Sequence, residues 1–106
     1  MQARIRQLAA DDIDTIVSRY RDDAGPEVAV DFVDQLEAAI EHLLSHPLTG
    51  SLRFAFELEI PDLRSWPLNR FPYLVFYVAG DEHIDIWRVL HARRDTPPAL
   101  VDGADR

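Results

Sequence analysis

The stretch that decides the fold is Ile84-Asp-Ile-Trp-Arg-Val-Leu-His-Ala-Arg-Arg-Asp95. Ile84 and Ile86 alternate with polar neighbours, which is the period-two pattern of a strand with one buried face. From Trp87 to Leu90, apolar side chains then fall on both faces. The stretch therefore predicts a last strand that lies centrally in a sheet, between other strands.

Cationic side chains gather where this strand ends. His91, Arg93 and Arg94 lie within four residues, and Asp95 could hold a guanidinium in place. Such a group could polarise a phosphodiester, with His91 as acid or base and an arginine stabilising the developing charge. It could equally bind acidic groups of another protein, and the negative charge of the chain favours this second interpretation.

Arg88 stands on the face of Ile84 and Ile86. A guanidinium on a buried face is either paired with a carboxylate, such as Asp62, or directed at a ligand. The sequence leaves both options open.

Length and composition limit what this ending can belong to. The chain has 106 residues and 47% hydrophobic content, which predicts one domain over residues 1–96, followed by a frayed tail over 97–106. With no cysteine, disulfides and thiolate zinc sites are excluded. We expect a cytoplasmic protein, because neither a signal peptide nor an apolar run of about 18 residues is present.

The net charge is −8. The molecule should therefore repel nucleic acid, so direct binding of DNA or RNA is not expected.

The upstream sequence predicts helices first and strands afterwards. Residues 4–8 alternate weakly as a short strand, and an apolar stripe from Asp11 to Ala24 predicts a helix. A second stripe runs from Pro26 to the residue before Pro47, and the short break requires the two helices to form an antiparallel hairpin. Three further segments read as strands: 52–60, 63–68 at an edge because of Pro67, and 71–78.

A hairpin of two helices can cover one face of this sheet only. The strands near 73–77 and 87–90 are apolar on the other face too, so we expect a partner to cover it. The alternative is that segment 52–60 folds over that face.

Other sites are weakly supported. His42 and His46 are four residues apart, but a third metal ligand is missing, so a structural role at a helix end is the better interpretation. There is no glycine-rich phosphate loop and no nucleophile elbow. No metal or other cofactor is expected.

Several motifs together resemble the ParE branch of the RelE/ParE toxins. They are Leu63-Arg64, Trp66-Pro-Leu68, Tyr73-Leu-Val-Phe-Tyr77, and Arg88-Val-Leu-His91 with Arg94-Asp95. Upstream, Ala10-Asp-Asp-Ile13, Tyr20, Gly25, Ala29-Val-Asp-Phe32, Leu36 and Pro47-Leu-Thr-Gly50 match as well. The resemblance extends through about residues 4 to 96.

The resemblance implies an α+β fold, with a short N-terminal strand and an antiparallel helical hairpin packed on one face of a three- or four-stranded antiparallel sheet. It implies a toxin of a type II toxin-antitoxin system that is neutralised by a ParD-like antitoxin and inhibits DNA gyrase without being an enzyme. RelE-like relatives instead cleave messenger RNA, using basic residues on the open sheet face. Here the mid-strand arginine of the nucleases is Leu74, and no tyrosine follows Arg94.

The resemblance also suggests two sets of functional residues. The target-binding rim comprises Arg64, Arg88, His91, Arg93, Arg94 and Asp95. The antitoxin groove is lined by Leu74, Phe76 and Trp87. Two alternatives remain open: a ribosome-dependent ribonuclease with His91 and Arg93 or Arg94 at the phosphate, and a non-toxic interaction scaffold, since toxins of this family are usually basic.

Overall fold

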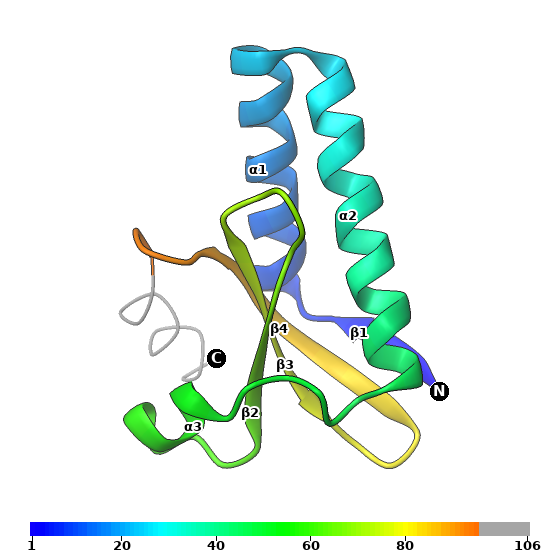
Figure 1. The fold of residues 1–106 in the computed structure, drawn as a ribbon, viewed down its shortest axis with the longest axis vertical. Helices are drawn as coiled ribbons and strands as arrows, with labels where there is room; N and C mark the ends of the chain where they lie inside the picture. The colour runs from blue at the N-terminus through cyan, green and yellow to red at the C-terminus, as the bar shows by residue number, and fades with distance from the viewer. Residues whose placement is uncertain (96–106) are drawn as a thin grey trace.

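Two long helices lie on one face of a four-stranded sheet (Figure 1). This computed structural model describes residues 1–95. The elements are β1 (Gln2–Ile5), α1 (Gln7–Ala24), α2 (Pro26–Ser45), α3 (Arg53–Leu58), β2 (Leu63–Pro67), β3 (Tyr73–Ala79) and β4 (His83–His91). The tail predicted over 97–106 lies outside the described residues.

The predicted helical hairpin is confirmed, but α1 begins earlier than expected. Helix α1 starts at Gln7 instead of Asp11, because Ala9 is fully buried and extends the apolar stripe by one turn. The first strand is correspondingly displaced to Gln2–Ile5. Gly25 joins the helices with φ of 102°, a conformation that L side chains rarely adopt, and Pro26 occupies the first turn of α2.

The strand order is β1-β4-β3-β2, so β4 is central as predicted. Strands β2, β3 and β4 are antiparallel neighbours, and β2 lies at an edge, where Pro67 can be tolerated. Strand β1 pairs with β4 in parallel, which differs from the fully antiparallel sheet that was predicted. This register turns Ala3 toward the helices, where it packs on the core.

The strand predicted over 52–60 is wrong. Arg53–Leu58 is a helical turn and a half, α3, in which Phe54 and Leu58 lie four residues apart and face the sheet. Phe56, which the alternation placed on the same face, is 81% exposed. In so short a segment, apolar spacings of two and of four cannot be separated, and packing on the sheet decides between them.

The sheet is apolar on both faces, and each face is covered differently. The helix side holds the main core, which comes from α1, α2, the two inner strands β3 and β4, and Leu68 after β2: Ala9, Ile16, Phe32, Leu36, Ala39, Leu43, Leu68, Tyr73, Val75, Tyr77, Ile84, Ile86 and Val89. The reverse side is covered in part by α3, whose Phe54 packs edge-on against Phe76 at 5.3 Å between ring centroids. The alternative in which 52–60 folds over this face is therefore partly confirmed.

The chain after α2 is attached to the sheet through Tyr77. The buried Tyr77 hydroxyl donates to the Pro47 carbonyl at 2.7 Å and accepts the Gly50 N–H at 3.0 Å. Arg64 adds donors to the carbonyls of Leu48 and Gly50, at 3.0 and 2.9 Å. A Cβ on Gly50 would lie 2.5 Å from the Tyr77 oxygen, so this close approach requires glycine.

Replacing Tyr77 by Phe should destabilise the protein by about 1–3 kcal/mol, because the buried Gly50 N–H and the Pro47 carbonyl lose their partner. Urea unfolding at pH 7 measures this change.

Burial raises the pKa of the Tyr77 phenol above its ordinary value of 10.0. The folded state thus holds the proton more tightly, and the resulting stabilisation is present below that ordinary value and is lost as pH rises through the folded pKa. Wild type should therefore lose more stability than the variant at alkaline pH, and equal losses would contradict this assignment.

Candidate functional site

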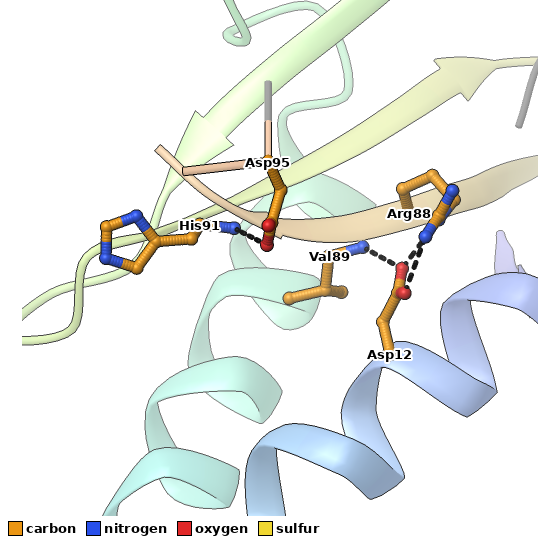
Figure 2. Close-up of polar contacts among 5 residues, drawn as sticks. All are labelled: Asp12, Arg88, Val89, His91 and Asp95. Atoms are coloured by element: carbon orange, nitrogen blue, oxygen red, sulfur yellow. Dashed lines mark hydrogen bonds and ion pairs between the residues drawn. The ribbon is translucent and has the colours of Figure 1, made fainter. Parts of the chain in front are cut away.

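One carboxylate of α1 organises the end of β4. Strand β1 covers the edge of β4 only as far as Ile86, whose carbonyl accepts the Arg6 N–H at 3.0 Å. Beyond Ile86, the Asp12 carboxylate lies beside the edge of β4 and accepts hydrogen bonds from it. Its Oδ2 accepts the Arg88 Nε–H at 2.7 Å and the Val89 N–H at 3.0 Å, and its Oδ1 accepts Arg88 Nη2 at 2.8 Å (Figure 2).

The side chains of Arg88 and Asp12 are 13% and 14% exposed, so this bidentate pair is largely withdrawn from water. Arg88 is therefore paired internally, as one of the two options allowed, but the suggested partner Asp62 is wrong. Asp62 lies in the turn before β2, with φ of 64°. No local signal distinguishes Asp12 from the other acids of α1, because the pair joins residues 76 positions apart.

A register shift in β4 resets which residues of its last part face the helices. Phe76 is opposite Arg88, yet Tyr77 is opposite Ile86, so Trp87 is an extra residue in β4. Such a bulge bends the strand and re-aims the side chains on either side of it. After the bulge Val89 packs on the helix side with Ile84 and Ile86, whereas Trp87 and Leu90 pack on the reverse side. Arg88, between them, is bound to Asp12 of α1.

The turn after β4 is held by its own side chains. His91 Nδ1 accepts the N–H groups of Arg93 and Arg94, both at 3.2 Å, and Asp95 Oδ2 accepts the His91 N–H at 3.3 Å. In Figure 2 the His91 ring points away from the Asp12–Arg88 pair. Asp95 thus holds the backbone of the turn, whereas the sequence interpretation had it holding a guanidinium.

The predicted rim residues fall into three places. His91, Arg93, Arg94 and Asp95 come together in the turn after β4, where both arginines are exposed. Arg88 is directed inward. Arg64 is on β2, separated from β4 by β3, hence about 10 Å away across the sheet, and its guanidinium donates to backbone carbonyls.

Between α1 and the turn there is a hollow of about 220 Å³. Its lining includes Arg19 of α1, which the sequence reading missed, together with Tyr73, Arg94 and Asp95. Arg94 Nη2 lies 3.4 Å from the Tyr73 hydroxyl. Arg19 escaped notice because it belongs to the polar side of an amphipathic helix, where an exposed arginine is the ordinary finding.

The predicted antitoxin residues all face the reverse side of the sheet. Leu74 and Trp87 are partly buried, whereas Phe76 is 0% exposed beneath Phe54. The Arg6 guanidinium carbon lies 4.2 Å from the centre of the Trp87 ring. Trp87 Nε1 is buried and has no hydrogen-bond acceptor among residues 1–95.

Over residues 3–96 the sequence matches the family described as "ParE toxin of type II toxin-antitoxin system, parDE". The chain belongs to the ParE toxin family. The resemblance inferred from the motifs is thereby confirmed, and the chain is the toxin component of a type II toxin-antitoxin system. A search of curated protein sequences found no match.

The fold of this ParE-family toxin is also found in a solved structure titled "Chromosomal ParDE TA system from P. aeruginosa". The two chains share 24% sequence identity with a TM-score of 0.72, over 88% of this chain and 97% of that chain. This similarity confirms the predicted α+β fold.

His42 and His46 pack against aromatic rings. His42 stacks on Trp66 at 4.6 Å and on His46 at 5.0 Å between ring centroids, at the C-terminal end of α2. Among residues 1–95, no group of three His, Cys, Asp or Glu side chains could hold a metal ion. No helix in that part of the toxin is long and apolar enough to cross a membrane.

Replacing Arg88 by Met should cost about 3 kcal/mol, because the Asp12 charge is left without its partner in a site largely closed to water. Combining it with Asp12→Asn should recover most of the loss, since an amide oxygen still accepts the Val89 N–H. Urea unfolding of both single variants and the double variant measures the coupling. Arg93→Met at the exposed turn is the control and should change stability by less than about 0.5 kcal/mol. An equal effect of the Arg88 and Arg93 substitutions would refute the structural role of the pair.

Proposed function

We propose that this ParE-family toxin inhibits DNA gyrase in the cytoplasm and is neutralised by a ParD-like antitoxin. The observation that supports this best is the chemistry of the partly open sheet face. Leu74, Val78 and Trp87 make it apolar; Arg88 is bound to Asp12, and the Arg6 guanidinium on this side lies over the Trp87 ring. A face of this kind suits contact with protein far better than contact with phosphate.

The arrangement gives little support for messenger cleavage. A nuclease of this fold needs cations on the open face, and Leu74 occupies the mid-strand position where one would stand. The His91 Nδ1 accepts two backbone N–H groups, from Arg93 and Arg94. That geometry orients the ring to fix the turn. The negative charge of −8 adds repulsion toward RNA.

The antitoxin is proposed to lie in the groove of the reverse face. Helix α3 forms one wall of this groove, and Arg6 above Trp87 lies on the opposite side. Leu74 and Trp87 would contact apolar side chains of the antitoxin directly, with Phe76 supporting them from below. An acceptor on the antitoxin could also satisfy Trp87 Nε1 once the exposed Arg6 side chain moves aside.

The target surface is proposed to be the turn after β4. Arg93 and Arg94 are exposed there, and His91 and Asp95 fix the backbone that presents them. Arg88 and Arg64 contribute by holding β4 and β2 in place through their internal contacts. Exposed arginines on a rigid turn are suited to acidic groups of a protein partner.

Purified toxin is expected to inhibit supercoiling by gyrase and to leave messenger RNA intact on translating ribosomes. Arg93→Ala with Arg94→Ala should weaken inhibition about tenfold or more, because two exposed charge contacts are lost. The matched control is Arg53→Ala, an exposed arginine on α3. Messenger cleavage without gyrase inhibition would reverse the assignment in favour of the ribonuclease, and unimpaired growth on expression would favour a non-toxic scaffold.

Leu74→Glu is expected to weaken binding of the ParD-like antitoxin by about 2 kcal/mol or more, since the introduced charge must be desolvated in an apolar groove. Leu48→Glu serves as control, because Leu48 is 67% exposed and outside the groove. Calorimetric titration with the antitoxin encoded beside the toxin measures both. Equal affinities of the two variants would place the antitoxin elsewhere.

A further inference from the structure

The edges of the sheet differ in whether they can accept another strand. At the outer edge of β2, Ser51 and Ser65 exchange hydrogen bonds at 2.9 and 3.0 Å, and Pro67 has no N–H to offer. That edge is therefore already occupied over part of its length and blocked at its end.

The edge of β4 that extends beyond β1 is also blocked. Its outward N–H groups are those of Val89 and His91, and each is bound by a carboxylate of this chain, from Asp12 at 3.0 Å and from Asp95 at 3.3 Å (Figure 2). The two carboxylates stand where the carbonyls of a neighbouring strand would be. Strand addition at this position would first have to displace both.

Strand β1 is the edge that stays open. Gln2 and Arg6 donate their N–H groups to Glu82 and Ile86 of the β4 side, at 3.3 and 3.0 Å. Because hydrogen-bonding direction alternates along a strand, Ala3 and Ile5 turn their N–H and C=O groups away from β4. Within residues 1–95 no segment pairs with the outer side of β1, whose only neighbour in the sheet is β4, and Ile5 is 47% exposed.

The charges along β1 indicate what kind of strand fits there. Arg4 and Arg6 are exposed and lie on the reverse side of the sheet, while Ala3 and Ile5 lie on the helix side. Asp85, opposite Arg4 in register, lies 3.6 Å from His83. In a chain with 19 acidic and 11 basic residues, residues 1–6 contain two arginines and no acid.

A second copy of this chain is a poor match for the same edge. Pairing two β1 strands side by side would gather Arg4 and Arg6 of both copies on one face of a short ribbon. Like charges at neighbouring positions destabilise such a pair. Asp81 and Glu82 line a hollow together with Gln2 and Arg4, so an acidic partner is favoured most toward Arg6 at the other end of the strand.

We propose that β1 is a docking edge for an extended acidic segment of the antitoxin, which adds a fifth strand and places alternate carboxylates against Arg4 and Arg6. The inference rests on the proposed neutralisation by an antitoxin and specifies the chemistry of the part that binds. Main-chain hydrogen bonds to Ala3 and Ile5 would supply affinity, and the two arginines would supply selectivity for acidic over basic strands.

The test uses the full-length ¹⁵N-labelled toxin and a blocked heptapeptide of sequence TVEVEVT, with TVKVKVT as the matched basic probe. Saturable shifts of the Ala3 and Ile5 amides with the acidic peptide, absent with the basic one, are expected. Ile5→Pro removes an outward N–H but leaves the β1–β4 hydrogen bonds in place, and it should abolish the chemical-shift change of the Ala3 amide. Ile5→Thr keeps that N–H and should preserve it.

Arg4→Glu with Arg6→Glu should weaken binding of the acidic peptide about tenfold or more and strengthen binding of the basic peptide. This result does not depend on whether the proline variant folds. Equal responses to both peptides, shifts confined to Leu74 and Trp87, or self-association through β1 without peptide would each overturn the proposal. The titration needs neither gyrase nor growth inhibition. Its failure would therefore refute the edge assignment alone, whereas absence of gyrase inhibition would refute the proposed target alone.

Discussion

The structure depends on the Asp12 carboxylate and the three hydrogen bonds that it accepts from Arg88 and Val89. Through them the first helix is fixed to the last strand at the point where β1 no longer accompanies β4. The single Asp12 carboxylate accepts hydrogen bonds from the Arg88 guanidinium and from the Val89 N–H. In a site largely closed to water, leaving either donor without an acceptor would cost free energy of folding. It also determines which cations of the chain remain available to other molecules.

The arginines of the sheet and of the turn after β4 fall into two groups, according to whether their side chains bind this chain or are exposed. Arg64 donates to a backbone carbonyl and Arg88 is paired with Asp12. Arg93 and Arg94 instead extend from the turn whose backbone is held by His91 and Asp95. Because the backbone of the turn is already fixed, only the two arginine side chains lose conformational freedom on binding, which favours recognition of a protein surface. An acidic ParE-family toxin can thus present a small basic surface even though its net charge is −8.

The reverse face of the sheet and the turn after β4 are formed by different residues. Helix α3 covers Phe76 and Leu63 and leaves Leu74, Val78 and Trp87 partly accessible, so only part of this face is uncovered. On the other side of Trp87 lie the Arg6 guanidinium and β1, the edge strand next to β4. An antitoxin could follow this path without occupying the turn at Arg93 and Arg94, and neutralisation need not compete directly for the same side chains as the target.

The sequence by itself determined the helical hairpin, the central position of β4 and the family, because these follow from apolar periodicity and from motifs that are local in the chain. It also limited Arg88 to two roles. It could not decide that residues 53–58 form a helix, since six residues fit either period until Phe54 packs on Phe76. The partner of Arg88, the parallel direction of β1 and the blocked edges of β2 and β4 were decided only by the tertiary structure. Apart from the local His91–Asp95 contact, they join groups that are not neighbours in the chain, and such contacts leave no pattern in the residues between them.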